Sequence, residues 1–318
     1  MAQSVRAGVL VAVGLWGMAC ADRPVGGLPD GVEAISLLGD TLRAPTLPDS
    51  VRQAREGELA SAQADLAGQR NSADALIWVG RRLAYLGRYR EAVATFTDGI
   101  SRFPQDARFY RHRGHRYITL RRLGLAVQDL ERGAQLVRGQ PDQVEPDGQP
   151  NARGIPTSTL QFNIWYHLGL AYYLQGDFTN ALRAYRECMA VSTNPDAQVA
   201  TSHWLYMTLR RLGQADSARV VLDPITPQLP IIENTAYFRL LQMYQGLLPA
   251  DSLFRVSGAE ASLQDITTAY GVGNWHWYNG QPDRANQVFR AILAGRSQWA
   301  AFGYIAAEAE LARRVGEP

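Results

Sequence analysis

Two histidines three residues apart are the first residues in this chain that could hold a metal. In "HRGH" (112–115), His112 and His115 would lie near one face of a helix, where two imidazoles can share an ion. Zinc sites use three or four protein ligands, and the sequence offers no third one nearby. We therefore favour packing or partner contact for both residues, and likewise for His167 and His203, and we predict no metal or other cofactor.

Motifs of catalysis and nucleotide binding are missing from the sequence. It contains no G-x-S-x-G, no H-E-x-x-H, no Walker A motif and no paired C-x-x-C. "GVGN" (271–274) begins like a dinucleotide fingerprint but lacks the third glycine and a preceding strand. Cys188 is expected to be a small buried apolar residue rather than a nucleophile. The sequence thus predicts a protein that is not an enzyme.

The charges of the chain are nearly balanced. All 32 positively charged side chains are arginines, and the formal net charge of +2 gives no general attraction to nucleic acid or to an anionic membrane. Within residues 73–140, however, 13 arginines face only 6 acidic residues. An acidic segment or a C-terminal carboxylate of a protein partner would suit that half of the chain.

The N-terminus predicts export. One arginine in "MAQSVR" precedes an uncharged apolar run at 7–19, which is shorter than the roughly 20 residues of a membrane-spanning helix and is typical of a secretory signal. Cleavage could follow Ala21, because Ala19 and Ala21 form an A-x-A site. A soluble periplasmic or secreted protein would result.

An alternative use of the same segment is lipidation. "GMAC" (17–20) resembles the lipobox of bacterial lipoproteins, although Gly17 stands where that family usually has Leu. The resemblance implies a signal peptide over 1–19, a lipid on Cys20 and, with Ala21 next, a place on the periplasmic face of the outer membrane. We favour this reading, in which the lipid is the only contact with the membrane.

Residues 20–50 and residues 51–318 differ in composition and in sequence pattern. The first segment is punctuated by Pro, Gly and Asp and is expected to be a flexible tether with little regular structure. The second consists of amphipathic segments with helical periodicity.

The helical segments repeat. Gly80 and Gly114 are 34 residues apart, as are Ala92 and Ala126. In "IWYHLGLAYYLQGDFTNALRAYREC" (164–188) the positions W-L-G-Y-A-F-A of the tetratricopeptide repeat (TPR) are held by Trp165, Leu168, Gly169, Tyr172, Ala181, Tyr185 and Cys188. The chain therefore resembles the TPR family. The resemblance implies an all-α, right-handed superhelical solenoid of antiparallel helix pairs, with about five to six repeats, a covering helix at 51–70 and a capping helix at 299–314.

An insertion interrupts the repeats at 141–161. Its 21 residues are rich in Pro, Gly, Asp and Asn. Such a segment is either a solvated surface loop or an ordered flap over the groove, and the sequence favours neither.

The resemblance also predicts a concave groove lined by the first helix of each repeat. Its inward positions combine arginines with aromatic side chains, the composition of interface anchors. They are Arg81, Tyr85, Arg108, Arg111, His115, Tyr166, Tyr173, His203, Arg210, Arg211, Asn274, Trp277 and Tyr278. The Lys/Asn clamp of chaperone-binding TPR domains is not reproduced.

We therefore expect a non-enzymatic scaffold of the cell envelope that binds a protein or peptide segment in this Arg/aromatic groove. One alternative is an envelope protein that binds, or even acts on, glycan or peptide, with Trp277 and Tyr278 stacking on the ligand. Another is self-association through the ends of the solenoid. The sequence does not name the partner.

Overall fold

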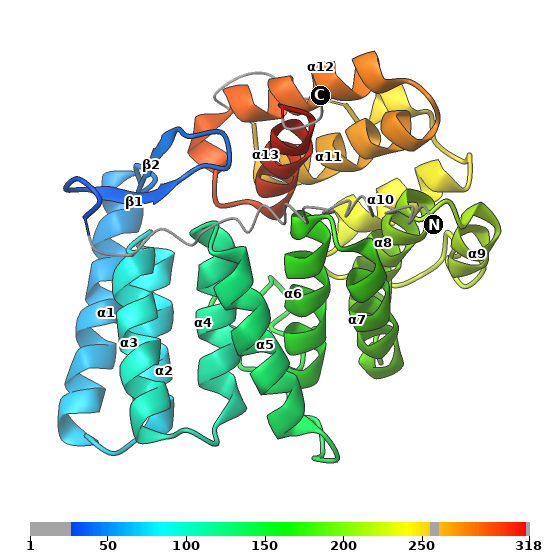
Figure 1. The fold of residues 1–318 in the computed structure, drawn as a ribbon. Coiled ribbons are helices and arrows are strands. Elements are labelled where there is room, and N and C mark those ends of the chain that lie inside the picture. The colour runs from blue at the N-terminus through cyan, green and yellow to red at the C-terminus, as the bar shows by residue number, and fades with distance from the viewer. Residues whose placement is uncertain (1–26, 255–260, 316–318) are drawn as a thin grey trace, which may run out of the picture.

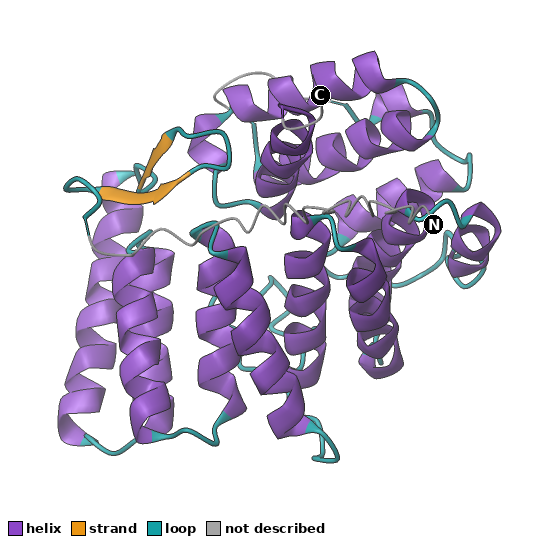
Figure 2. Ribbon diagram, in the orientation of Figure 1, coloured by secondary structure: helices purple, strands orange, loops and turns teal. Residues whose placement is uncertain are grey.

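The computed structural model describes residues 27–254 and 261–315 (Figure 1). Within these residues the regular structure is helical apart from one two-stranded sheet (Figure 2). The strands are β1 (Val32–Ile35) and β2 (Thr41–Arg43). The α-helices are α1 (Asp49–Gly68), α2 (Ala73–Tyr85), α3 (Tyr89–Arg102), α4 (Ala107–Thr119), α5 (Leu123–Val137), α6 (Leu160–Gln175), α7 (Phe178–Val191), α8 (Pro195–Arg211), α9 (Ala215–Val221), α10 (Thr235–Tyr244), α11 (Leu263–Tyr278), α12 (Pro282–Ala294) and α13 (Phe302–Val315).

The helices form a solenoid of hairpin pairs. Helices α2 and α3, α4 and α5, α6 and α7, α8 and α9, and α11 and α12 pack as consecutive pairs. Figure 1 shows α1 to α7 standing side by side, with α1 covering the first pair. The all-α solenoid predicted from the repeats is confirmed. Among the described residues, helix α10 is not followed by a second helix that pairs with it. It packs against α8 and α11.

Glycines at the helix crossings show why the repeat pattern folds this way. A Cβ atom added to Gly80 would lie 2.4 Å from the buried Phe96 ring, and one added to Gly169 would lie 2.6 Å from Tyr185. Real Cβ atoms do not approach other atoms so closely, so only glycine lets the two helices of each pair meet at this distance.

The turn within each helix pair requires a left-handed residue. Gly87, Gly176, Gly213 and Gly280 all have positive φ there, as the repeat pattern predicts. Arg121 holds the equivalent place in the second repeat with φ of 61°, the one non-glycine residue with positive φ among the described residues. A side chain in this conformation costs about 1–2 kcal/mol, so its presence calls for a compensating contact.

That contact is a buried ion pair with Glu308 of α13. The guanidinium of Arg121 donates from Nε to Glu308 Oε2 at 2.9 Å and from Nη2 to Oε1 at 2.8 Å, a bidentate geometry. Both side chains are 2% exposed or less. Arg121 also donates to the carbonyl of Trp299 at 2.7 Å. A turn early in the array is thereby joined to its last helix.

The N-terminal segment corrects one expectation. Residues 20–50 were expected to be a flexible tether, but β1 and β2 pair as an antiparallel hairpin with Val32 and Leu42 buried. The hairpin reaches the C-terminal part of the chain, where Leu37 N donates to Glu308 Oε2 at 3.3 Å and Trp299 Nε1 donates to the carbonyl of Arg43 at 2.7 Å. The segment is part of the folded body from Val32 onward.

Helix α13 does more than cap the last repeat. It packs against α11 and α12, as a capping helix would, and also against α6 of the third repeat. At its start, the Phe302 ring lies 5.3 Å from His115 and 5.5 Å from His167, centroid to centroid. In Figure 1 the hairpin and α11 to α13 lie across one end of the standing helices. The solenoid therefore closes on itself.

Breaking the closure from one side should destabilise the protein strongly. Glu308→Ala leaves Arg121 buried without its anion, a change that costs about 3–5 kcal/mol of unfolding free energy. Urea unfolding measures that loss, and hydrogen exchange should show lost protection at the Leu37 amide, whose acceptor is removed.

The matched control is Glu91→Ala, which removes the partner of the exposed Arg88. Exposed pairs contribute at most about 1 kcal/mol. Equal losses in the two variants would show that the Arg121–Glu308 pair does not hold the two ends together.

Candidate functional site

The insertion at 141–161 folds over the inner face of the first repeats. The Glu145 carboxylate lies 2.9 Å from Arg111 Nε and accepts a hydrogen bond from Asn163 at 3.1 Å. The carbonyl of Pro146 accepts one from Arg81 at 2.7 Å. These contacts tie the segment to α2, α4 and α6.

Both ends of the insertion are also held. Val144 and Thr159 form an isolated antiparallel bridge at the base of the segment. The Thr157 hydroxyl donates to Glu233, and the Thr157 carbonyl accepts from Asn194 at 2.9 Å. Of the two readings of the sequence, the structure thus has the ordered flap and not the solvated loop.

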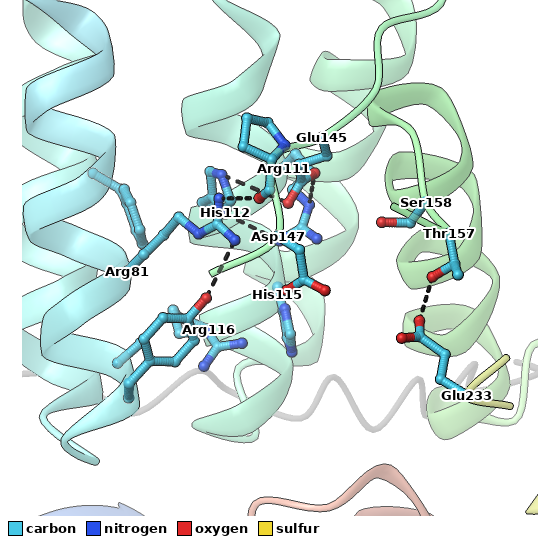
Figure 3. Close-up of a pocket in the computed structure, with 14 residues that line it drawn as sticks. Arg81, Arg111, His112, His115, Arg116, Glu145, Asp147, Thr157, Ser158 and Glu233 are labelled. Atoms are coloured by element: carbon cyan, nitrogen blue, oxygen red, sulfur yellow. Dashed lines mark hydrogen bonds and ion pairs between the residues drawn. The ribbon is translucent and has the colours of Figure 1, made fainter. Parts of the chain in front are cut away.

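A cavity of about 250 Å³ lies beneath this flap, between it and helices α2 and α4 (Figure 3). Arg81 and Tyr85 reach it from α2, and Arg111, His115 and Arg116 from α4. From the flap, the residues that line the cavity are Glu145, Pro146, Asp147, Thr157 and Ser158. The site is therefore cationic on its helical side and acidic on the side of the flap.

A second cavity of about 510 Å³ adjoins the first and shares Arg111, His115 and Glu233 with it. Its walls come from α6, α8, α10, α11 and the start of α13. Aromatic and apolar side chains line much of it, namely Phe162, Tyr166, Tyr237, Leu263 and Phe302. The two cavities form the open part of the concave face.

Five of the thirteen predicted groove residues line these two cavities. They are Arg81, Tyr85, Arg111, His115 and Tyr166. Arg108 borders a smaller space next to them, but Asp106 and Asp74 hold its guanidinium and raise its pKa, with the Asp106 hydrogen bond as the main cause. Five of the predicted residues thus border open space in the structure, and whether they bind a partner stays a prediction.

In the second half of the array, several predicted groove residues are core residues instead. Tyr173, His203 and Asn274 are at most 1% exposed. Asn274 Nδ2 donates to Tyr173 Oη at 2.8 Å, and His203 stacks on Tyr237 with centroids 4.8 Å apart. These side chains satisfy one another because the array curves and brings its inner helices together.

The remaining four predicted residues have internal partners. Arg211 donates to Glu310 of α13 at 2.8 Å, and Arg210 donates to Tyr206 at 3.0 Å. Guanidinium groups also cover one face of each aromatic ring: Arg314 lies 3.7 Å from the Trp277 centroid, and Arg210 lies 4.3 Å from that of Tyr278. Ligand stacking on these rings, as in the glycan alternative, would have to displace an arginine.

Several residues of the site were not predicted. Arg116 and Glu145 line the first cavity, and Phe302 and Tyr237 line the second. Arg116 lies one position away from the predicted His115 on α4. Phe302 and Tyr237 come from units far along the chain, and no local pattern links them to the first repeats.

The arginine excess in residues 73–140 is partly neutralised by the fold. Glu145 pairs with Arg111, and Asp129 pairs with Arg113 through two contacts of 2.7 Å. Asp129 belongs to the segment itself, whereas Glu145 comes from outside it, so Glu145 is the one of the two that reduces the excess.

The histidine pair does not form a metal centre in the described residues. His112 stacks on Phe96 with centroids 5.3 Å apart, and the His115 ring lies tilted against His167 with centroids 4.3 Å apart. Among the residues that the structure describes, no group of three or more His, Cys, Asp or Glu side chains is placed to hold an ion. Burial holds the pKa of each of the three histidines well below its usual value, so they are neutral packing residues at pH 7.

The structure tests the prediction for one of the two cysteines. Cys188 is fully buried, as predicted, and burial raises the pKa of its thiol to about 12. Cys20 and the signal peptide at 1–19 lie outside the described residues. Across the ranges 27–254 and 261–315, no helix has the length and apolarity needed to cross a membrane.

The fold and the crossing glycines define an α-solenoid built from helix-turn-helix repeats. The chain contains tetratricopeptide repeats: models of the tetratricopeptide repeat family match residues 80–143 and residues 162–194. No curated protein matches the chain in sequence.

Solved structures that resemble the chain include other TPR proteins. MamA is 14% identical over 61% of this chain and 92% of its own, with a TM-score of 0.42. YrrB, described as a TPR protein with an unusual peptide-binding site, is 13% identical over 73% and 90%, also with a TM-score of 0.42. A putative kinesin light chain of Podosopora anserina with TPR-like repeats is 13% identical over 71% and 95%, with a TM-score of 0.41.

The buried histidines predict acid sensitivity. Burial lowers the pKa of His203 to about 3, whereas in the unfolded chain it is about 6.5. Because the unfolded state then binds more protons, stability falls as the pH drops below about 6.5, by about 1.4 kcal/mol per such histidine at pH 5.5. His203→Gln should remove about that much from the difference in unfolding free energy between pH 7.5 and pH 5.5.

Cys188→Ala is the control for this measurement. It perturbs the same core without removing a group that titrates in this range. An unchanged pH dependence in the His203 variant, relative to the wild type, would contradict the assignment.

Proposed function

We propose that this protein is a non-enzymatic scaffold that binds a protein or peptide segment in the open part of its concave face. The second cavity carries the proposal, because aromatic side chains on its walls lie beside polar groups that could hold a peptide backbone, as in a peptide-binding site. Leu263, at its edge, is 57% exposed, which is unusual for a large apolar side chain beside a cavity.

The flap and the first cavity give this site its polarity. A bound segment would enter beside Phe162 and Tyr237 and meet Arg111 and His115 where the two cavities join. Arg111 is paired with Glu145, and a carboxylate of the partner would take the place of Glu145, because arginine favours carboxylates through its planar set of donors. We therefore propose that the partner segment is acidic, or ends in a carboxylate, on the side nearest the flap.

The place of action that we propose is the cell envelope. The support is the signal-like N-terminus with its lipobox-like "GMAC" at 17–20. A lipid on Cys20 would hold the folded body at the periplasmic face of the outer membrane. The hairpin that starts at Val32 would leave about a dozen residues as the connection to that anchor.

A charged side chain placed in the second cavity should abolish partner binding. Ala236, on α10, lines this cavity, and Ala236→Arg would fill it with a long cationic side chain. Tagged protein is incubated in envelope extract and then cross-linked. We expect the amount of each specifically captured protein to be at least tenfold lower for the variant than for the wild type.

Ala60→Arg is the matched control, since it adds the same side chain on the exposed face of α1. Both variants should keep the wild-type circular dichroism spectrum. If both capture the same proteins as the wild type, the concave face is not the binding site.

Lipidation is tested separately from binding. Cys20→Ser should move the protein from the membrane fraction to the soluble periplasmic fraction and abolish incorporation of labelled palmitate. Cys188→Ser serves as the control, because its buried thiol should not be modified. Palmitate label that persists in Cys20→Ser would overturn the lipoprotein assignment.

A further inference from the structure

Arg116 is an arginine at the floor of the first cavity without an anionic partner. Its described neighbour is the Tyr89 ring, with the guanidinium carbon 5.5 Å from the centroid. Among the described residues no hydrogen bond or ion pair reaches its guanidinium, which borders the cavity (Figure 3). Burial, together with the charges of Arg111 and Arg81, lowers the pKa of Arg116 to about 10. A cation in this position is stabilised by any anion that enters.

Arg81, on the facing helix, has neutral partners only. It donates to the Pro146 carbonyl at 2.7 Å and to the Tyr85 hydroxyl at 3.2 Å, and its guanidinium lies over the Trp78 ring at 4.4 Å. Neither acceptor carries a charge. Two guanidinium groups thus face the same small space from α2 and α4 without a carboxylate of their own.

The acidic residues around the cavity do not neutralise this floor. Glu145 is held by Arg111 and Asn163, and Glu233 by Thr157 and Asn151 at the far side. Asp147 lies on the exposed flap and accepts a hydrogen bond from the Gln149 amide at 2.9 Å. With Glu233, whose partners Thr157 and Asn151 are neutral, it is an acid whose charge an incoming anion would meet at the rim.

We propose that the cavity beneath the flap is a binding site for a small organic carboxylate, with Arg116 and Arg81 as its anion receptors. A guanidinium binds a carboxylate through charge-assisted, often paired hydrogen bonds. Phe96, Tyr85 and Ala84 supply the apolar walls for the rest of the molecule. The site goes beyond the proposed binding of a protein segment, which occupies the neighbouring cavity and meets this one at Arg111 and His115.

The size and the roof of the cavity decide between a free acid and the side chain of a protein. A volume of about 250 Å³ lies below the roughly 300–1,000 Å³ of sites for drug-sized ligands, so the occupant is small. The flap covers it closely: a Cβ atom on Gly148 would lie 2.1 Å from the Tyr85 hydroxyl. The flap thus closes this edge of the cavity, and the small volume suits a small acid rather than a length of polypeptide.

Titration calorimetry in low-chloride buffer tests the site with sodium benzoate, sodium acetate, inorganic phosphate and a capped Gly-Glu-Gly peptide as probes. We expect saturable binding of benzoate, weaker binding of acetate, and no competition of the peptide with benzoate. Arg116→Gln should weaken benzoate binding at least tenfold, because it removes a charged hydrogen-bond donor. Asp147→Asn, on the exposed flap, should tighten it about threefold, because it removes a repelling charge.

Arg132→Gln, a change on α5 outside the lining of the cavity, is the control and should bind benzoate as the wild type does. Circular dichroism establishes that each variant is folded, and the Asp147 variant keeps the test valid if Arg116→Gln does not fold. Binding of benzoate that neither variant alters would overturn the proposal. Saturable binding of phosphate or of the Glu peptide, with none of benzoate, would also overturn it and would assign the arginines to a different ligand. None of these outcomes measures binding in the second cavity, so the protein-binding proposal is tested separately by Ala236→Arg.

Discussion

The buried pair between Arg121 and Glu308 is the contact on which the shape of this molecule depends. Solenoid repeats touch only their neighbours, so an array of this length would by default remain open along its inner face. The pair joins the turn of the second repeat to the last helix, across 187 residues of chain. Desolvating two charges is expensive, and a buried pair is weak evidence of net stability. The pair instead fixes the relative positions of three elements. Glu308 also accepts a hydrogen bond from the Leu37 amide, so a single carboxylate holds the hairpin, the turn and α13 relative to one another.

Closure changes the role of the inner helices. In an open array their inward side chains would face solvent or a partner, whereas here those of the later repeats face one another. Tyr270, Tyr173 and Asn274 are linked by hydroxyl and amide hydrogen bonds of 2.8 to 3.1 Å. The same network includes Glu310, whose burial raises its pKa while Arg313 and Arg211 lower it by more, so that the carboxylate stays ionised. Polar side chains suited to a binding groove have become a satisfied polar core. The space left for a ligand lies beneath the flap, against the first repeats, and beside it, where α6 faces α8, α10, α11 and the start of α13.

A feature of this molecule can be predicted from the sequence when the residues that determine it lie close together in the chain. The crossing glycines and turn glycines act within one repeat, so the 34-residue period predicts them, and Gly80 and Gly169 lie where the pattern requires. The five groove residues of α2, α4 and α6 were predicted for the same reason. The flap could not be predicted, because its position depends on Arg81 and Arg111 meeting the Pro146 carbonyl and Glu145. The hairpin was missed because β1 and β2 are short and rest on Trp299, far along the chain. Arg121, at the position where the other repeats have glycine, was the one local signal of closure that the pattern offered.

The exclusive use of arginine fits this architecture. A guanidinium can form a bidentate pair, donate to carbonyl groups and stack on a ring at the same time, which an ammonium group cannot. Arg121 pairs with Glu308, donates to two carbonyl groups and lies 5.3 Å from the Trp299 centroid. Arg314 covers the Trp277 ring while it contacts Glu310 and Asn286. Most arginines on the inner face are thus occupied by the fold itself. The number of arginines therefore says little about ligands, and their partners say more. Arg116 and Arg81 line one cavity, and no carboxylate is paired with either of them. A search for ligand sites in closed repeat proteins should begin with cations that the fold leaves without an anion.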